Sequence, residues 1–446
     1  MRLLTAPALA VAPLWVTPTA AAVTPPRPDE ARLPAAGPAA PPRPTSQHGE
    51  CVTAPVMPPE PGEPGQLVGV DLSTVWALTR GAGQTVAVID TGVARHQLLP
   101  HLLPGGDYVS SQDGTADCDG HGTIVAGIIG AAPDSTDTNG PEAFSGIAPD
   151  VSILAIRQSS NKFREVGAAV DSGVGDVDTL AAAVRAAADL GATVINISSV
   201  ACLSAEAEID DRALGAALAY AVDVKNVVVV SAAGNVGGAG QCPGHNPSDS
   251  TGWEDVAVVA SPAWYDEYVL TVGSVRPDGT ASTFSLAGPW VDVAAPGEGV
   301  VSLAPAAEGL VNSRNGEAAI SGTSYSAAVV SAIAALVRAR TPGLTARQVM
   351  QRVEETSLHP AGGWNASVGR GVVDALAALS ELDGSAPGRP WTPNVETAGT
   401  EPAAGGRPER TAARGAAICL ALTGGIVLVS KVAGRLRRRE VAVSGD

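Results

Sequence analysis

The fold of this 446-residue chain is constrained most by an alternation of short apolar runs and alanine-rich segments through its middle. Runs rich in β-branched residues predict buried strands, at Thr85–Ile89, Ser152–Ile156, Thr193–Ser198 and Val227–Ser231. Alanine-rich segments between the later runs predict helices, at Asp178–Leu190 and Arg212–Val222. Strands that alternate with helices form right-handed βαβ units. The pattern therefore predicts an α/β fold with a mainly parallel sheet covered on both faces.

The later part of the chain continues this pattern. Two further strands and a long helix are expected, at Val269–Val272, Val291–Ala294 and about Ser324–Arg340. Pro342 would end that helix, and a capping box at Thr345 would begin another. The segment Arg157–Asp176 is polar, contains glycine and lacks periodicity, which predicts an exposed loop.

Polar residues follow several of the predicted strands directly. Asp90 closes the first apolar run, Ser198 closes another, and Asn235 lies in a Gly-Asn turn after a third. Ligands of such sheets bind beyond the carboxyl ends of the strands, so these side chains are expected to converge. Asn235 is a candidate donor to an oxyanion, and an ordinary loop asparagine is the alternative interpretation.

His121 and Ser324 supply the other groups that nucleophilic catalysis needs. His121 lies between two glycines in Asp119-Gly-His-Gly-Thr123, at the start of a predicted helix. Ser324 starts an apolar helix, whose free N–H groups favour a nearby oxyanion. A serine nucleophile needs a base, and the base needs an orienting acid, here Asp90. Taken singly, the histidine block could be a plain turn and the serine an N-cap.

Composition divides the chain and limits its partners. The net charge of −17 argues against a nucleic acid partner.

Residues 1–22 are typical of an export signal. Residues 415–434 are typical of a transmembrane helix, and a basic cytoplasmic tail, 435–446, follows them. Between them we expect a proline-rich extension at 23–67, a compact domain at 68–383 and a Pro/Gly/Ala linker at 384–414. The compact domain is thus expected outside the cytoplasm, anchored to the cell membrane by one span.

Four of the five cysteines lie outside the predicted span. An even number behind an export signal predicts disulfides, for which three pairings exist. We prefer Cys51–Cys118 and Cys202–Cys242, because the second pair would join two loops that leave successive strands. A zinc site is the rival interpretation, but no Cys-x-x-Cys spacing is present. No metal and no cofactor are therefore expected.

The blocks Val86-Ala-Val-Ile-Asp90-Thr-Gly, Asp119-Gly-His121-Gly-Thr123 and Ser321-Gly-Thr-Ser324-Tyr-Ser-Ala-Ala328 resemble those of the subtilisin-like serine peptidases. Their order, Asp, His, Ser, is also that of subtilisin. The resemblance implies a three-layer α/β/α domain with endopeptidase activity and a protein or peptide substrate. It implies triad roles for Asp90, His121 and Ser324 and an oxyanion role for Asn235. It implies that substrate binds along Ser198, Ser199 and Val200, where the family often has glycine instead of Val200.

The overall arrangement is more narrowly similar to the mycosins, the membrane-anchored peptidases of actinobacterial type VII secretion systems. The segment Asn196-Ile-Ser-Ser-Val-Ala-Cys202 adds to this resemblance. It implies an exported protein as substrate, the secretion membrane complex as partner, and an extension that stays attached. Two alternatives are a catalytically dispensable scaffold of that complex and a general protein-degrading extracellular subtilisin.

Overall fold

The computed structural model describes residues 23–53, 64–133, 144–168, 173–207, 209–238, 241–249, 252–314 and 318–380. All of these belong to one compact unit, Met1–Pro393. The expected signal peptide, linker, transmembrane helix and tail lie outside the described residues. Within the described ranges, no helix is both long and apolar enough to cross a membrane.

A seven-stranded sheet forms the centre of this unit, in the order β11-β10-β8-β6-β2-β4-β3. Every neighbouring pair in it is parallel. Its strands are β2 (Thr85–Asp90), β3 (Leu102–Asp107), β4 (Ser152–Arg157), β6 (Val194–Ile197), β8 (Val228–Ala232), β10 (Leu270–Val275) and β11 (Val293–Pro296). The α/β class and the parallel sheet predicted from the apolar runs are therefore confirmed.

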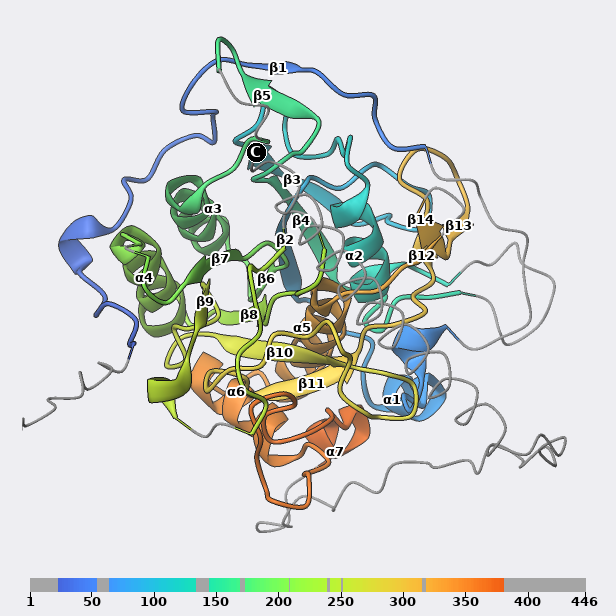
Figure 1. Ribbon diagram of the computed structural model, residues 1–446. Coiled ribbons are helices and arrows are strands. Elements are labelled where there is room, and N and C mark those ends of the chain that lie inside the picture. Colours follow the sequence, from blue (N-terminus) through green and yellow to red (C-terminus); the bar gives the residue numbers. More distant parts are fainter. Residues whose placement is uncertain are drawn as a thin grey trace, which may run out of the picture. The chain divides into compact units, whose positions relative to one another are not determined.

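Helices cover both faces of the sheet (Figure 1). The α-helices are α1 (Leu72–Leu78), α2 (His121–Gly130), α3 (Val177–Asp189), α4 (Arg212–Ala219), α5 (Thr323–Arg340), α6 (Ala346–Glu355) and α7 (Ala375–Leu379). A π-turn, Tyr220–Val224, extends α4, and short 3-10 turns lie at Glu30–Arg32, Gly65–Leu67 and Trp253–Asp255. Helices α3 and α4 pack together on one side, whereas α2 and α5 pack together on the other.

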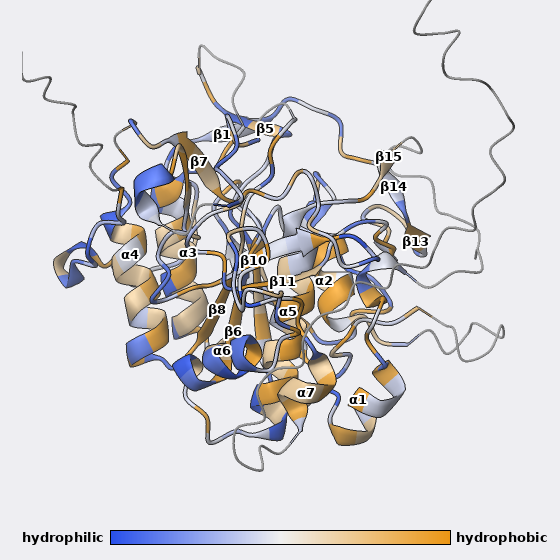
Figure 2. Cartoon of the chain, turned by 60° about the horizontal axis from the view of Figure 1, so that its bottom comes forward, coloured by the Kyte–Doolittle hydropathy of each residue, from blue (hydrophilic) through white to orange (hydrophobic). Residues whose placement is uncertain are grey.

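The helices differ in how much of their surface is buried. Every residue of α5 from Thr323 to Val337 is buried, because the helix lies between the sheet and α2. Its many alanines allow that close packing on all sides. Helix α6 is amphipathic instead, with Val349, Met350 and Val353 buried, and Figure 2 shows its hydrophilic face. Its N-cap Thr345 forms the predicted capping box with Gln348.

The prediction for Arg157–Asp176 needs correction. The segment contains a strand, β5 (Phe163–Glu165), which pairs antiparallel with β1 (Thr45–Gln47) of the proline-rich extension. The extension crosses the molecule to reach it (Figure 1). The paired residues are far apart in sequence, so the local pattern could not reveal the strand, and its polarity indicated a loop. Other small antiparallel pairs are β7 (Ala201–Ser204) with β9 (Val258–Ser261), β12 (Ser302–Leu303) with β13 (Leu310–Val311), and β14 (Ser313–Arg314) with β15 (Ala318–Ala319).

Candidate active site

Asp90 and His121 are joined by a short hydrogen bond. Asp90 is the last residue of β2 and is fully buried, and His121 is the first residue of α2. The Nδ1 atom of His121 lies 2.7 Å from Oδ1 of Asp90, and the backbone N–H of Thr91 donates to the same oxygen at 2.7 Å. A carboxylate at Nδ1 favours the tautomer whose Nε2 accepts a proton. The pair therefore has the geometry of a general base with its orienting acid.

Gly122 explains why α2 can approach β2 so closely. A Cβ atom at this position would lie 2.0 Å from the carbonyl oxygen of Gly92 and 3.0 Å from Cβ of Asp90. No side chain fits there without moving the backbone. The glycine after His121 is thus required by the distance between the two elements that carry the acid and the base.

Ser324 lies in the first turn of α5 and is only 6% exposed. Its hydroxyl donates to the backbone carbonyl oxygen of Ser198, 3.3 Å away, just beyond the end of β6. The ring of the next residue, Tyr325, lies 5.4 Å from the ring of His121, measured between centroids. The structure therefore places Ser324 against the predicted substrate strand, and it places the residue that follows Ser324 beside the ring of His121.

Asn235 is held by the turn that precedes Ser324. Its Oδ1 accepts from the backbone N–H of Thr323 at 3.0 Å and from the Thr323 hydroxyl at 3.2 Å. Its Nδ2 lies 3.8 Å from the position that a Cβ atom would take on Gly322. With Oδ1 occupied in this way, the amide N–H groups are the part of the side chain left to donate. This is the arrangement that an oxyanion donor needs.

A cavity of about 450 Å³ adjoins His121. It is lined by Val52, Thr91, Asp119, Gly120, His121, Ile124, Ser159, Asn161, Lys162, Ser198, Ser199, Pro305, Val311, Ser313 and Tyr325. Ser198 and Ser199 line the cavity, whereas half-buried Val200 packs against the hydrophobic core. Its size and mixture of polar and apolar walls suit part of a peptide.

Val52 and Asp119 are among the residues of this wall that were not predicted to belong to the site. Val52 belongs to the extension and is placed by a hydrogen bond from its N–H to the carbonyl of Cys118, 2.8 Å long. Asp119 accepts from the Ser160 hydroxyl and, at 2.8 Å, from the backbone N–H of Asn161. The signal available for Val52 was its position next to Cys51, which forms a disulfide with Cys118 as preferred. No local pattern linked Asp119 to a loop 41 residues away.

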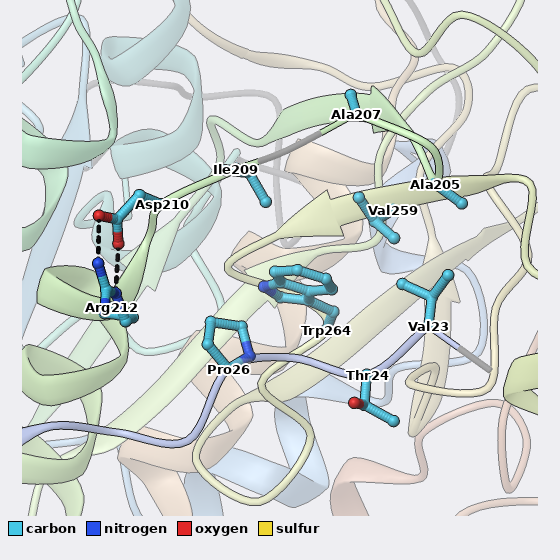
Figure 3. A pocket seen from close by; sticks show the side chains of 10 residues that line it. All are labelled: Val23, Thr24, Pro26, Ala205, Ala207, Ile209, Asp210, Arg212, Val259 and Trp264. Atoms are coloured by element: carbon cyan, nitrogen blue, oxygen red, sulfur yellow. Dashed lines mark hydrogen bonds and ion pairs between the residues drawn. The ribbon is translucent and has the colours of Figure 1, made fainter. Parts of the chain in front are cut away.

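Another hollow, of about 620 Å³, lies where the extension begins and contains no triad candidate (Figure 3). Val23, Thr24 and Pro26 of the extension line it. Trp264 and Val259 face them, and Asp210 and Arg212 at its margin are paired with each other at 2.7 Å. The hollow therefore lies between the start of the extension and the compact domain, with a mostly apolar lining. Within the described ranges, no cluster of three or more His, Cys, Asp or Glu is placed to hold a metal ion.

Comparison with known proteins agrees with this geometry. Residues 81–372 match the Subtilase family, and the chain belongs to that family of serine peptidases. Within the family it belongs with the mycosins. It is 54% identical to Mycosin-4 of Mycobacterium tuberculosis (strain ATCC 25618 / H37Rv) over 474 residues, which cover 100% of this chain and 99% of the relative.

Solved structures give the same result. The crystal structure of MycP1 from the ESX-1 type VII secretion system is similar with a TM-score of 0.75 and 41% identity, over 82% of this chain and 99% of that one. A chain in the intact ESX-5 inner membrane complex is similar with a TM-score of 0.75 and 40% identity, over 92% and 100%. The protein is therefore a subtilisin-like serine endopeptidase.

Proposed function

We propose that Asp90, His121 and Ser324 form the catalytic triad and that Asn235 stabilises the oxyanion. The main support for this proposal is the 2.7 Å distance between Nδ1 of His121 and Oδ1 of Asp90, beside a cavity that Ser198 lines. Ser324 Oγ attacks the scissile carbonyl carbon while His121 Nε2 takes the hydroxyl proton. The tetrahedral oxyanion is bound by the Asn235 amide, and His121 then delivers the proton to the departing amine. Water hydrolyses the acyl-enzyme by the same route, which restores Ser324.

The peptide is proposed to bind in extended form along Ser198, Ser199 and Val200. The hydroxyl of Ser324 donates to the Ser198 carbonyl, so the nucleophile lies next to this segment. Main-chain hydrogen bonds along an added strand bring the scissile bond to the nucleophile. Side chains lining the cavity then select the sequence.

Ser324→Ala tests the triad. We expect peptide hydrolysis to fall by about 10⁶-fold with the fold intact, the magnitude typical of removing a subtilisin nucleophile. Labelling by a serine-directed phosphonate should also disappear. Ser326→Ala is the matched control, since this buried serine lies on the same helix and should retain both activity and labelling. Unchanged hydrolysis by the purified Ser324 variant would refute the triad.

We further propose that the enzyme acts outside the cytoplasm, anchored by residues 415–434, on exported proteins of a type VII secretion system. Two observations support this. The similar MycP1 comes from the ESX-1 type VII secretion system, and a similar chain is part of the ESX-5 inner membrane complex. The apolar stretch followed by four arginines supplies a membrane anchor with its basic end in the cytoplasm.

Anchoring and cutting can be tested separately. Deletion of residues 415–446 should release an active peptidase that no longer supports secretion. Ser324→Ala should keep the chain in the complex but abolish cleavage. Gentle detergent extraction and pull-down of the tagged full-length chain should recover secretion components. If none is recovered and the truncated chain supports normal secretion, the role in secretion is wrong and a general extracellular peptidase is favoured.

A further inference from the structure

Asp117, four residues before His121, is a carboxylate without a role in the triad. It accepts four hydrogen bonds. One oxygen receives the N–H of Gly120 at 2.7 Å and the hydroxyl of Thr91 at 2.8 Å. The other receives the N–H of Thr123 at 2.9 Å and the Thr123 hydroxyl at 2.7 Å. All four donors belong to the two segments that carry Asp90 and His121.

These bonds fix the first turn of α2. A helix begins with unsatisfied N–H groups, which an N-cap side chain usually satisfies. Here the N-cap is Gly120, with a left-handed φ of 81° and no side chain to offer. Asp117 takes over that task for Gly120 and Thr123. Thr91 connects a further N–H group to Asp117, because its hydroxyl oxygen accepts the N–H of Gly122 at 3.0 Å while the same hydroxyl donates to Asp117.

Asp117 also lies in the electrostatic surroundings of Asp90. The charge of Asp90, at the end of β2, acts on Asp117; the other titratable groups of these segments, His121 on α2 and Asp119, line the cavity together with Lys162. Burial raises the pKa of Asp117 to about 6, its hydrogen bonds oppose this rise, and the charge of Asp90 adds to it. The carboxylate form is therefore present above this pH and is lost as the pH falls through about 6.

We propose that Asp117 is a positioning residue of the catalytic apparatus. It holds the start of α2 so that His121 meets Asp90, and its negative charge favours the protonated His121 that forms when Ser324 attacks. Asp117 touches neither substrate nor reacting atoms and acts through His121. This inference rests on the proposed triad.

The test is the pH dependence of kcat/KM in the full chain, with Asp117→Asn compared with wild type. Asparagine offers one acceptor oxygen in place of two and carries no charge. We expect kcat/KM at neutral pH to fall roughly ten- to hundredfold, because a small displacement of the base is costly. On the acidic side, the plot of log kcat/KM against pH should approach a slope of about two for the wild type. For the variant the slope should be about one, and the fall should begin at lower pH, because one titrating group has been removed.

Asp113→Asn is the matched control, since this carboxylate in the same segment accepts from Thr115 and pairs with Arg95. It should keep the wild-type profile. Thr91→Val separates geometry from charge: kcat should fall about tenfold while the steep acidic limb remains, because Asp117 still titrates.

An unchanged slope in the Asp117 variant, or unchanged kcat in the Thr91 variant, would overturn the proposal. If Asp117→Asn does not fold, a wild-type slope of about one would overturn it instead. Failure of the triad is distinguished separately, because the Ser324→Ala variant would then remain active.

Discussion

The two disulfides support different parts of the site. Cys51–Cys118 ties the extension to the segment just before α2, three residues from His121. Cys202–Cys242 joins β7, which follows the segment proposed to bind substrate, to the segment after Asn235. Its sulfur atoms lie 3.2 and 2.9 Å from the position a Cβ atom would take on Gly234, and the N–H of Cys242 donates to the carbonyl of Asn235 at 2.8 Å.

This difference shows that similar crosslinks can serve separate purposes. The second bridge packs against the turn that carries Asn235, the proposed oxyanion donor, so we expect it to restrain that side chain. The first bridge attaches a segment that lies outside the matched family region, residues 81–372. We therefore expect the two to have similar effects on stability and unequal effects on turnover.

The largest expected effect in this comparison belongs to Asn235, the proposed oxyanion donor. Asn235→Ala should lower kcat by about 10²–10³-fold with little change in KM, because the lost hydrogen bond strengthens only in the transition state. Steady-state kinetics on a peptide substrate measure this. A loss below about threefold would mean that Asn235 is not the donor and that the second bridge restrains no catalytic group.

Removing the second bridge comes next. The Cys202→Ala, Cys242→Ala double variant should lose up to about 4 kcal/mol of unfolding free energy by loop entropy. Its kcat should fall roughly tenfold because the turn carrying Asn235 is less well positioned. Combining it with Asn235→Ala should give less than the product of the two losses, since both act on one interaction. Full multiplicativity would contradict the assigned role.

Removing the first bridge should leave turnover nearly unchanged. The Cys51→Ala, Cys118→Ala double variant should also lose up to about 4 kcal/mol, because its loop of 67 residues is of comparable length to the other, 40. We expect kcat within about threefold of wild type, since Asp117 and Thr91 still hold the start of α2. Denaturant unfolding and kinetics on the same samples give both quantities. A tenfold loss of kcat would erase the distinction between the bridges.

The smallest effect is expected at the exposed ion pair of the extension. Arg43 and Glu165 are 2.9 Å apart, but their side chains are 72% and 38% exposed. Arg43→Ala should therefore change the unfolding free energy by less than about 1 kcal/mol. Thermal denaturation at low and high salt measures it. A larger change would show that charge, rather than the bridge and strand pairing, holds the extension in place.

Most of the fold could be predicted because its signals are local. The runs that became β2, β4, β6 and β8 are short, apolar and β-branched, and Thr345 and Gln348 cap α6 as predicted. The groups Asp90, His121, Ser324 and Asn235 could be named because each lies at a strand end or helix start. The structure joins Asp90 to His121 and Ser324 to Ser198.

The features that were not predicted depend on contacts between residues distant in sequence, or on a glycine that has no side chain to signal its role. The pairing of β1 with β5 joins residues about 120 apart, within segments that look like loops. Asp117 was overlooked because its partners include Thr91, 26 residues earlier. A glycine at the N-cap of α2 was the available clue, because such a helix must find its acceptor elsewhere.

The pairing of β1 with β5 also bears on how this enzyme survives its own activity. Asn161 and Lys162, just before β5, line the cavity beside His121, and the carbonyl of Lys162 accepts the N–H of His48 at 2.9 Å. An extended segment with free backbone groups is what a peptidase binds as an added strand. Because the extension occupies the Lys162 carbonyl and pairs with Phe163–Glu165, we expect it to keep the nearest loop from serving as substrate. Self-digestion at 161–168 should therefore appear when residues 23–53 are removed, and should be absent from the same truncation carrying Ser324→Ala.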